Sequence, residues 1–277
     1  MSKRLYLGIA VASCAALFWL CAAGLRAQSS TPPQSATPQP LSARTPVIVE
    51  LFTSEGCSSC PPADTLLARI DSIQPFASID VIPIEEHVDY WDDQGWKDPF
   101  SSVRWTDRQR DYTFSQHTGS PYTPEMVVDG TVGFLGSRGP MVRDAILRAA
   151  ASQTTKVDLR EVSPIQNGMV TFKVAIERLT NDPKKDKSDV ILGITETGLH
   201  SNVGAGENSG HELHHSAVLR ELKVIGEIGK NGQDSFSAEP SVKLGAKWDI
   251  ANLRAVAFVQ EKKSRRILGA AEIHLTQ

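Results

Sequence analysis

Apolar residues in the first part of the chain alternate between strand-like and helix-like spacing. Residues 46–52 and 79–84 are short apolar runs rich in β-branched residues, and both predict buried strands. Between them, apolar side chains recur at helical spacing over residues 63–73. This pattern predicts a strand–helix–strand unit.

The same alternation continues to about residue 150. Residues 107–117 and 140–151 predict helices, and 140–151 carries a clear apolar face. Residues 122–130 predict a strand that ends in a tight Asp-Gly turn, with residues 131–135 returning as its hairpin partner. The first half is therefore predicted to be of the α/β class.

The second half lacks a long helical pattern and contains short strand-like runs separated by turn residues. Such spacing is typical of an antiparallel β-sandwich. The predicted strands are residues 157–162, 169–177, 189–197, 217–228, 241–244, 253–261 and 266–274.

The N-terminal segment has the pattern of an export signal. Lys3 and Arg4 precede residues 5–25, which carry no charge, and a cleavage point follows Ala27. An uncleaved anchor is the alternative, because about 20 apolar residues can span a bilayer. Residues 1–27 are therefore predicted to be a signal peptide or N-terminal anchor. The protein should be exported, periplasmic or secreted, and should contact the membrane only through this segment if it is uncleaved.

Three further features of the sequence concern its linker, its charge and its motifs. Residues 28–44 are rich in Ser, Thr, Pro and Gln without apolar periodicity, and predict a disordered linker. The net charge is −3, so no basic excess is available to neutralise phosphates, and we expect no nucleic-acid partner. No Gly-rich phosphate loop occurs, and we expect no bound organic cofactor.

Cysteine usage supplies the main candidate chemistry. Of four cysteines, two lie in the export segment, which leaves only Cys57 and Cys60 in the mature chain. A CxxC pair between a strand and a helix is typical of thioredoxin-like redox motifs, in which the first cysteine attacks and the second resolves the mixed disulfide. We expect Cys57 to be the exposed nucleophile and Cys60 the more buried thiol. A structural disulfide is the alternative; a zinc site would need two further ligands, and we assign no metal ligand.

Tyr122-Thr123-Pro124 is the second motif. In a thioredoxin-like fold a cis proline precedes the third strand and faces the CxxC pair, and the apolar run after Pro124 matches such a strand. We therefore expect a cis bond before Pro124, with Thr123 beside it in contact with substrate.

Several segments together resemble a family of secreted bacterial thioredoxin-like proteins that is known only as a domain of unknown function. The resemblance implies a thioredoxin-like fold and secretion, and it implies no particular substrate. It covers about residues 45–277, and its motifs are Glu50 to Asp64 around the CxxC pair, His87 to Trp91, Gly95-Trp96, Arg108-Gln109, Tyr122 to Pro124 with Val128 to Gly130, and Gly206 to Gly210 followed by Leu213, His215 and Arg220.

Polar and aromatic residues after the second strand are further candidates. His87 and Asp89 belong to an acidic cluster, Glu85 to Asp93, where a carboxylate or imidazole can relay a proton beside the disulfide. Trp91 lies among aromatic residues that either line a partner-binding groove or form a small core. The alternative for the acidic cluster is a solvated loop. The aromatic residues are Tyr90, Trp91, Trp96 and Trp105.

A histidine-rich stretch in the second half leaves three interpretations open. Dense imidazoles can bind Cu or Zn, the stretch can be a plain polar loop, or its Gly206–Gly210 segment can contact the first domain or a ligand. The histidines are His200, His211, His214 and His215.

Together these patterns predict an α/β thioredoxin-like domain over residues 45–155, followed by an all-β sandwich-like domain over residues 156–277. The predicted function is thiol–disulfide exchange with protein thiols or disulfides, by Cys57, Cys60 and Pro124. Thr123, Trp91, His87 and Asp89 are predicted to contact the substrate. The alternative is a non-enzymatic envelope binding protein with a structural disulfide, which could bind copper.

Overall fold

The computed structural model describes residues 44–153, 155–179, 186–229 and 233–276. The expectations for residues 1–27 and, apart from Arg44, for the linker at 28–44 lie outside the described residues. Elements of the first half lie close to their predicted positions. They are β1 (Thr45–Thr53), α1 (Pro61–Ile73), β2 (Ile79–His87), α2 (Val103–Gln116), β3 (Glu125–Val128), β4 (Val132–Leu135) and α3 (Gly139–Ala150).

The second half is built of strands, as the apolar pattern predicted. Three of these strands, β8, β9 and β11, had no predicted counterpart. The strands are β5 (Val157–Gln166), β6 (Met169–Ile176), β7 (Ser188–Glu196), β8 (Leu199–Asn202), β9 (Glu212–His215), β10 (Val218–Ile228), β11 (Phe236–Ala238), β12 (Ser241–Lys243), β13 (Leu253–Glu261) and β14 (Ile267–His274).

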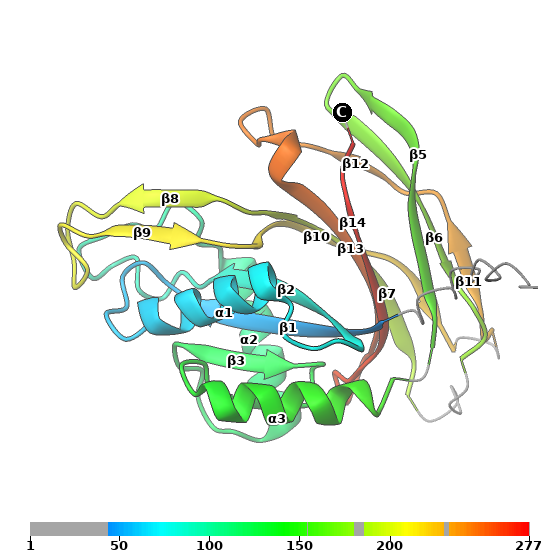
Figure 1. Ribbon diagram of the computed structural model, residues 1–277, viewed down its shortest axis with the longest axis horizontal. Coiled ribbons are helices and arrows are strands. Elements are labelled where there is room, and N and C mark those ends of the chain that lie inside the picture. The colour runs from blue at the N-terminus through cyan, green and yellow to red at the C-terminus, as the bar shows by residue number, and fades with distance from the viewer. Residues whose placement is uncertain (1–43, 154, 180–185, 230–232, 277) are drawn as a thin grey trace, which may run out of the picture. The chain divides into compact units, whose positions relative to one another are not determined.

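One mixed sheet of eight strands runs through both halves of the chain, in the order β14-β13-β7-β10-β2-β1-β3-β4 (Figure 1). β1 and β2 are parallel over their whole length, from Thr45 opposite Ile79 to Thr53 opposite His87. The junction between the halves is short: Val218 of β10 pairs with Glu85 of β2, and the Glu85 amide donates to the Ala217 carbonyl at 2.9 Å.

This junction overturns the predicted fold class. An α/β thioredoxin-like domain followed by a separate all-β sandwich would keep the strands of the two halves in different sheets. Instead, β7, β10, β13 and β14 extend the sheet that β1 to β4 begin. Apolar periodicity specifies that a segment is a strand and which face is buried, but it carries no information about which strand lies next to it.

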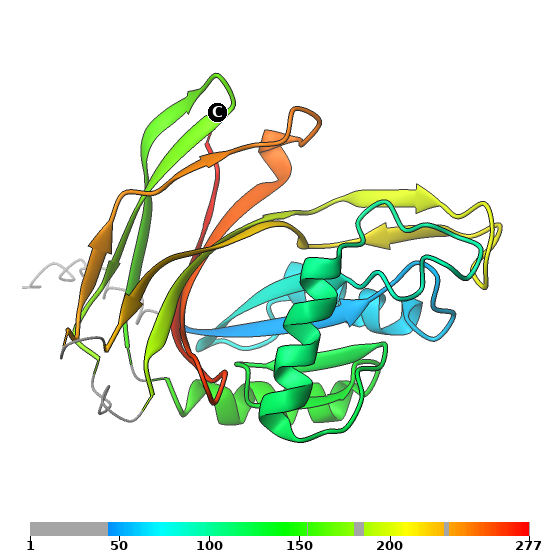
Figure 2. The ribbon, with the colours of Figure 1, turned by 180° about the vertical axis from the view of Figure 1, so that it is seen from behind.

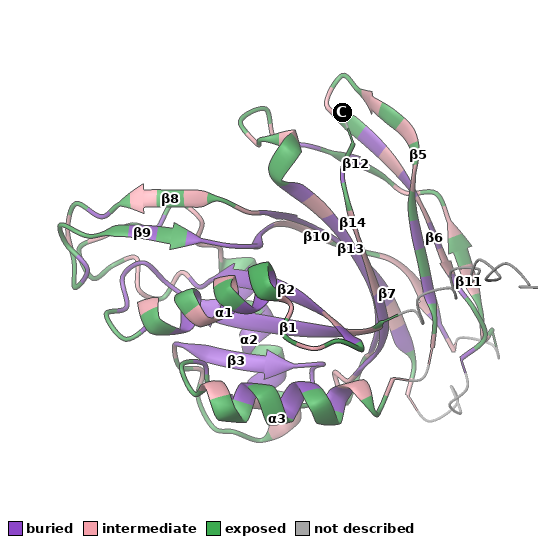
Figure 3. Cartoon of the chain, in the orientation of Figure 1, coloured by how far each residue is buried: buried purple, intermediate pink, exposed green. Residues whose placement is uncertain are grey.

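Both faces of the long sheet are covered. α1 and α3 pack on one face of β1 to β3, and α2 packs on the other (Figures 1 and 2). Farther along the sheet, β7 and β13 are buried on both faces: Val190, Leu192 and Ile194 enter one core cluster, whereas Ile191 enters another. Figure 3 shows β1, β2 and β3 as mostly buried, whereas β10 is buried only at its ends.

A second, four-stranded sheet covers the far end of the first. It contains β5, β6, β11 and β12, with β6 as the central strand. Its strands alternate between buried and more exposed positions, as expected for a sheet with one face toward solvent. Val170, Phe172 and Val174 of β6 form its inner face and pack against β7 and β13.

The Asp129-Gly130 turn after β3 contains a buried carboxyl. Asp129 Oδ1 accepts from the Ile48 amide at 2.9 Å and Oδ2 accepts from Gln153 Nε2 at 2.7 Å. Burial, with a smaller contribution from Glu50, raises the pKa of Asp129 to about 7. The folded state therefore holds a proton that the unfolded chain releases near pH 4.

We predict that Asp129→Asn removes a pH-dependent loss of stability. A raised pKa in the folded state contributes stability below the unfolded pKa, and this is lost as pH rises toward 7. Relative to wild type, the variant should gain roughly 2 kcal/mol or more in unfolding free energy between pH 4 and pH 8. Asn suits the left-handed backbone (φ 45°), and Gln153 Oε1, which has no hydrogen-bond partner among the described residues, can accept from the new amide.

Urea unfolding of both proteins across this pH range measures the effect. Asp144→Asn, at an exposed position on α3, is the matched control and should leave the difference from wild type constant with pH. A constant difference for Asp129→Asn as well would contradict the prediction.

Candidate functional site

Cys57 and Cys60 form a disulfide at the carboxyl end of β1. The S–S distance is 2.18 Å and the Cα atoms are 5.5 Å apart, so the predicted pairing of Cys57 with Cys60 is confirmed. Cys60 is the N-cap of α1, and Pro61 and Pro62 occupy the first two helical positions, where a missing N–H costs no intrahelical hydrogen bond. The pair therefore lies at the beginning of a helix.

The disulfide is covered. Cys57 and Cys60 are both 0% exposed, so the expectation of an exposed Cys57 is wrong. The loop between β8 and β9, here named the cover, crosses from the second half of the chain and is hydrogen-bonded to the CxxC turn. Asn208 Nδ2 donates to the Glu55 carbonyl at 2.8 Å and to the Cys57 carbonyl at 3.0 Å, and Glu207 accepts from the Ser58 amide at 3.0 Å.

Trp91, Thr123 and Pro124 lie together beside the disulfide turn. The Thr123–Pro124 bond is cis, as predicted. Trp91 Nε1 donates to Thr123 Oγ1 at 2.8 Å, which joins two residues predicted to contact substrate. A Cβ placed on Gly56, the residue before Cys57, would lie 3.0 Å from Trp91 Cβ, so Trp91 packs directly against the turn.

His87 and Asp89 do not share one site. Asp89 is half-buried, and its carboxylate accepts from Thr106 on α2 at 2.5 Å. His87 is fully buried and enters a cluster of ionisable side chains. The aromatic residues that were predicted to lie together near His87 are also apart. Trp105 is in the core, whereas the Trp96 indole N–H donates to Glu55 at 2.7 Å.

The buried cluster, here named the His–carboxylate cluster, consists of Glu55, Glu85, His87, Asp98 and His215. His87 Nδ1 lies 2.7 Å from Asp98 Oδ2, and His87 Nε2 lies 3.2 Å from Glu85 Oε1. His215 Nδ1 lies 2.7 Å from the same Glu85 oxygen, and His215 Nε2 lies 3.1 Å from Glu55 Oε1. Three carboxylates and two imidazoles therefore form one continuous network.

The charges in this cluster hold one another in their ionised forms. Burial alone would lower the pKa of His215, but the charge of Glu85 raises it to about 9. Burial likewise opposes the charge on His87, whose pKa is raised well above its ordinary value by Asp98. Conversely, the imidazolium of His215 outweighs burial and lowers the pKa of Glu85 to about 2.

Asp64, in the first turn of α1, carries a further buried carboxyl group near the disulfide. It lies one turn after Cys60, its amide donates to the Cys60 carbonyl at 3.2 Å, and Thr53 Oγ1 donates to its carboxyl at 2.6 Å. Burial, aided by the charge of Glu85, raises its pKa to about 7. A carboxyl with this pKa exchanges protons readily near neutral pH.

The histidine-rich stretch divides between surface and interior. His200 and His214 face each other across the exposed β8–β9 pair with ring centroids 6.0 Å apart, and His211 contacts the Asn208 carbonyl within the loop. His215 alone of the four points into the His–carboxylate cluster. The Gly206–Gly210 segment contacts the first half of the chain, mainly through the side chains of Glu207 and Asn208.

Four site residues were not singled out from the sequence: Glu55, Asp64, Asp98 and Asn208. Glu55, Asp64 and Asn208 lie inside segments that carried the family resemblance, which was the available signal. Asp98 lies in a polar insertion with no local pattern that marks it. Its role is visible only when the insertion folds back, because its carboxylate accepts from the Glu55 amide at 2.8 Å.

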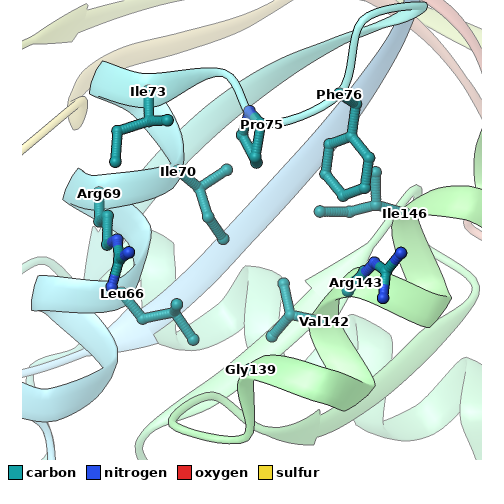
Figure 4. A pocket seen from close by; sticks show the side chains of 10 residues that line it. All are labelled: Leu66, Arg69, Ile70, Ile73, Pro75, Phe76, Gly139, Val142, Arg143 and Ile146. Atoms are coloured by element: carbon teal, nitrogen blue, oxygen red, sulfur yellow. The ribbon is translucent and has the colours of Figure 1, made fainter.

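A surface hollow lies elsewhere, between α1 and α3 (Figure 4). Its wall is apolar apart from Arg69 and Arg143, and Figure 4 shows Ile70 and Val142 projecting toward it from opposite helices. None of the predicted site residues lines it.

Comparison with known proteins identifies the family. The sequence model described as "Protein of unknown function (DUF1223)" matches residues 48–260. The chain belongs to this family. The prediction of an uncharacterised family is therefore confirmed. No curated protein matches the chain in sequence.

Two solved structures resemble the DUF1223 chain in fold. A crystal structure of an Agrobacterium tumefaciens protein is 22% identical, with a TM-score of 0.62, covering 84% of this chain and 96% of that one. HBP35 of Porphyromonas gingivalis is 15% identical, with a TM-score of 0.63, covering 84% of this chain and 76% of that one. Among the described residues, no helix has the length and apolar character needed to cross a membrane.

We predict that Asn208→Ala makes the disulfide easier to reduce. The substitution removes two buried hydrogen bonds that hold the cover on the CxxC turn, which together contribute about 1–3 kcal/mol to the closed state. If reduction requires opening, the rate of reduction by dithiothreitol should rise roughly five- to hundredfold.

The rate is measured by alkylating the released thiols at intervals. Ser209→Ala is the matched control, because the Ser209 hydroxyl donates to Gly204 within the loop and has no recorded hydrogen bond to the CxxC turn. Equal rates for wild type and Asn208→Ala would show that the cover does not limit access.

Proposed function

We propose that this protein is an exported thiol–disulfide exchange protein that acts through Cys57 and Cys60. The observation that carries the proposal is a closed CxxC disulfide at the beginning of α1, beside the cis Thr123–Pro124 bond and under a cover held by side chains of a separate loop. The resemblance to thioredoxin-like proteins rests on this local arrangement, so we propose shared redox chemistry rather than a shared domain fold.

The exchange can be written so that electrons and atoms balance. A partner thiolate attacks Cys57 Sγ, a partner–Cys57 disulfide forms, and Cys60 leaves as a thiolate that takes up a proton. A second partner thiolate then attacks the partner sulfur and releases Cys57. One partner dithiol is oxidised to a disulfide, and the Cys57–Cys60 disulfide is reduced to two thiols. The reverse sequence oxidises the pair.

We further propose that Asp64 takes part in the proton transfer at Cys60. It lies one helical turn from the resolving cysteine and is buried, and its pKa of about 7 allows it to give or take a proton at neutral pH. Trp91 and Thr123, which flank the turn, are the side chains that a bound partner would contact once the β8–β9 loop opens.

Export remains part of this proposal. It rests on the charge and apolar pattern of residues 1–27 and on the confinement of the other two cysteines to that segment. A disulfide between the two mature cysteines is consistent with an oxidising compartment.

A second candidate function is a binding protein in which the disulfide is structural. The complete burial of both cysteines favours it, because an exchanging sulfur must be reached by an attacking thiolate. In that case the reduction potential should be low and exchange slow.

We predict a reduction potential above about −230 mV in a glutathione titration, as for known exchangers, and mixed disulfides with partner proteins on a Cys60→Ser variant. Cys60→Ser retains the attacked sulfur but cannot resolve the intermediate. Cys57→Ser is the matched control and should capture far less, because the proposed exchange takes place at Cys57 Sγ and not at Cys60.

A low reduction potential without partner capture would contradict the proposal. A potential below about −300 mV, with no partner captured by either variant, would assign the disulfide a structural role and would refute exchange as the function.

A further inference from the structure

The His–carboxylate cluster has a donor arrangement that the proposed exchange does not use. Glu85 and His87 lie two residues apart on β2, so their side chains leave the same face of the strand. His215 arrives from the end of β9. One ligand atom from each of the three residues lies within 4.8 Å of the others, and all three residues are buried.

The donor atoms lie close to the spacing that a small cation needs. Bonds of about 2.0–2.2 Å from a metal to nitrogen or oxygen need donors roughly 3.0–3.6 Å apart. Glu85 Oε1 lies 3.2 Å from His87 Nε2, within this range, and 2.7 Å from His215 Nδ1, so the His215 ring would move back by about 0.3 Å or more to admit an ion. The other Glu85 oxygen accepts from the Ser216 amide at 2.9 Å, which fixes the carboxylate and leaves Oε1 directed at both rings.

A second carboxylate also fixes the orientation of each imidazole, through the ring nitrogen that does not face Glu85. His87 Nδ1 contacts Asp98, and His215 Nε2 contacts Glu55, so in both rings the nitrogen opposite Glu85 is held by an acidic side chain. Histidines that bind metals show this arrangement, because the outer carboxylate fixes the ring and increases its basicity.

The charge balance permits a cation. Glu55, Glu85 and Asp98 carry three negative charges in a buried region, and the protonated imidazoles of His87 and His215 reduce this to one negative charge. A divalent ion held by the neutral imidazoles leaves the same net charge, so it can take the place of the two protons. Phe100 is half-buried and its ring packs at 5.3 Å from His87 and 5.5 Å from His215, which closes the cluster toward solvent.

We propose that Glu85, His87 and His215 bind a divalent transition-metal ion such as Zn²⁺, with Asp98 and Glu55 as the outer carboxylates. Two imidazoles and one carboxylate are a donor set that suits zinc and neighbouring first-row ions. No metal ligand was expected from the sequence, because the exposed and buried histidines cannot be distinguished there. The site stands independently of the exchange chemistry.

The experiment measures Zn²⁺ retained by the purified, chelator-stripped protein with the Cys57–Cys60 disulfide kept oxidised, so that no thiolate contributes a ligand. After prolonged equilibration with Zn²⁺ and removal of free metal, wild type should retain about one ion per chain. Affinity is then measured by competition with a chromophoric chelator. His87→Gln and His215→Gln should each abolish retention.

His214→Gln is the matched control, because His214 is adjacent to His215 but its side chain is 74% exposed. It should retain the ion as wild type does.

If the ligand variants fail to fold, Glu55→Gln keeps an oxygen acceptor for His215 and should weaken Zn²⁺ affinity by about ten- to hundredfold. Unchanged affinity in Glu55→Gln overturns the proposal, as does a wild type that retains no Zn²⁺. Loss of Zn²⁺ in His214→Gln but not in His215→Gln also overturns it, because binding then belongs to the exposed pair His200 and His214.

Discussion

The structure depends on the burial of three consecutive ionisable residues at the end of β2. Glu85, Glu86 and His87 are each 0% exposed, and burying charges is unfavourable unless each one is paired and hydrogen-bonded. Because side chains alternate along a strand, Glu86 meets Arg108 of α2 on one face, at 3.2 Å, whereas Glu85 and His87 meet His215 and Asp98 on the other. Both layers around the sheet are therefore tied to one short stretch of chain.

The sequence predicted the elements well because their apolar patterns are local. The apolar runs of β7 and β13, which are buried on both faces, and the apolar stripe of α3 follow directly from residue spacing. β8 and β9 escaped prediction because Leu199–Asn202 and Glu212–His215 are short, polar and partly exposed. The joining of β10 to β2 escaped for another reason: it depends on contacts between residues more than a hundred positions apart, such as Glu85 with Ser216.

The candidate site also has one part that the sequence predicted and another that it did not. Two short motifs, Cys57 with Cys60 and Thr123 with Pro124, indicate their chemistry without the rest of the chain. The structure brings these residues together with Trp91. The burial of the disulfide and the His–carboxylate cluster could not be predicted, since both are made by side chains from distant segments. His214 and His215 illustrate the limit: they are neighbours in sequence, yet one is exposed and the other is buried between two carboxylates.

The cover over the disulfide has a consequence for biosynthesis. Ser58 and Glu207, which join the CxxC turn to its cover, are 149 residues apart. A ribosome makes the chain from its N-terminus, so both thiols are translated long before the loop that shields them. During that interval, an oxidant or an oxidising catalyst can react with the uncovered thiols of Cys57 and Cys60 in the nascent chain. The finished protein therefore buries two sulfur atoms that are accessible in its own precursor.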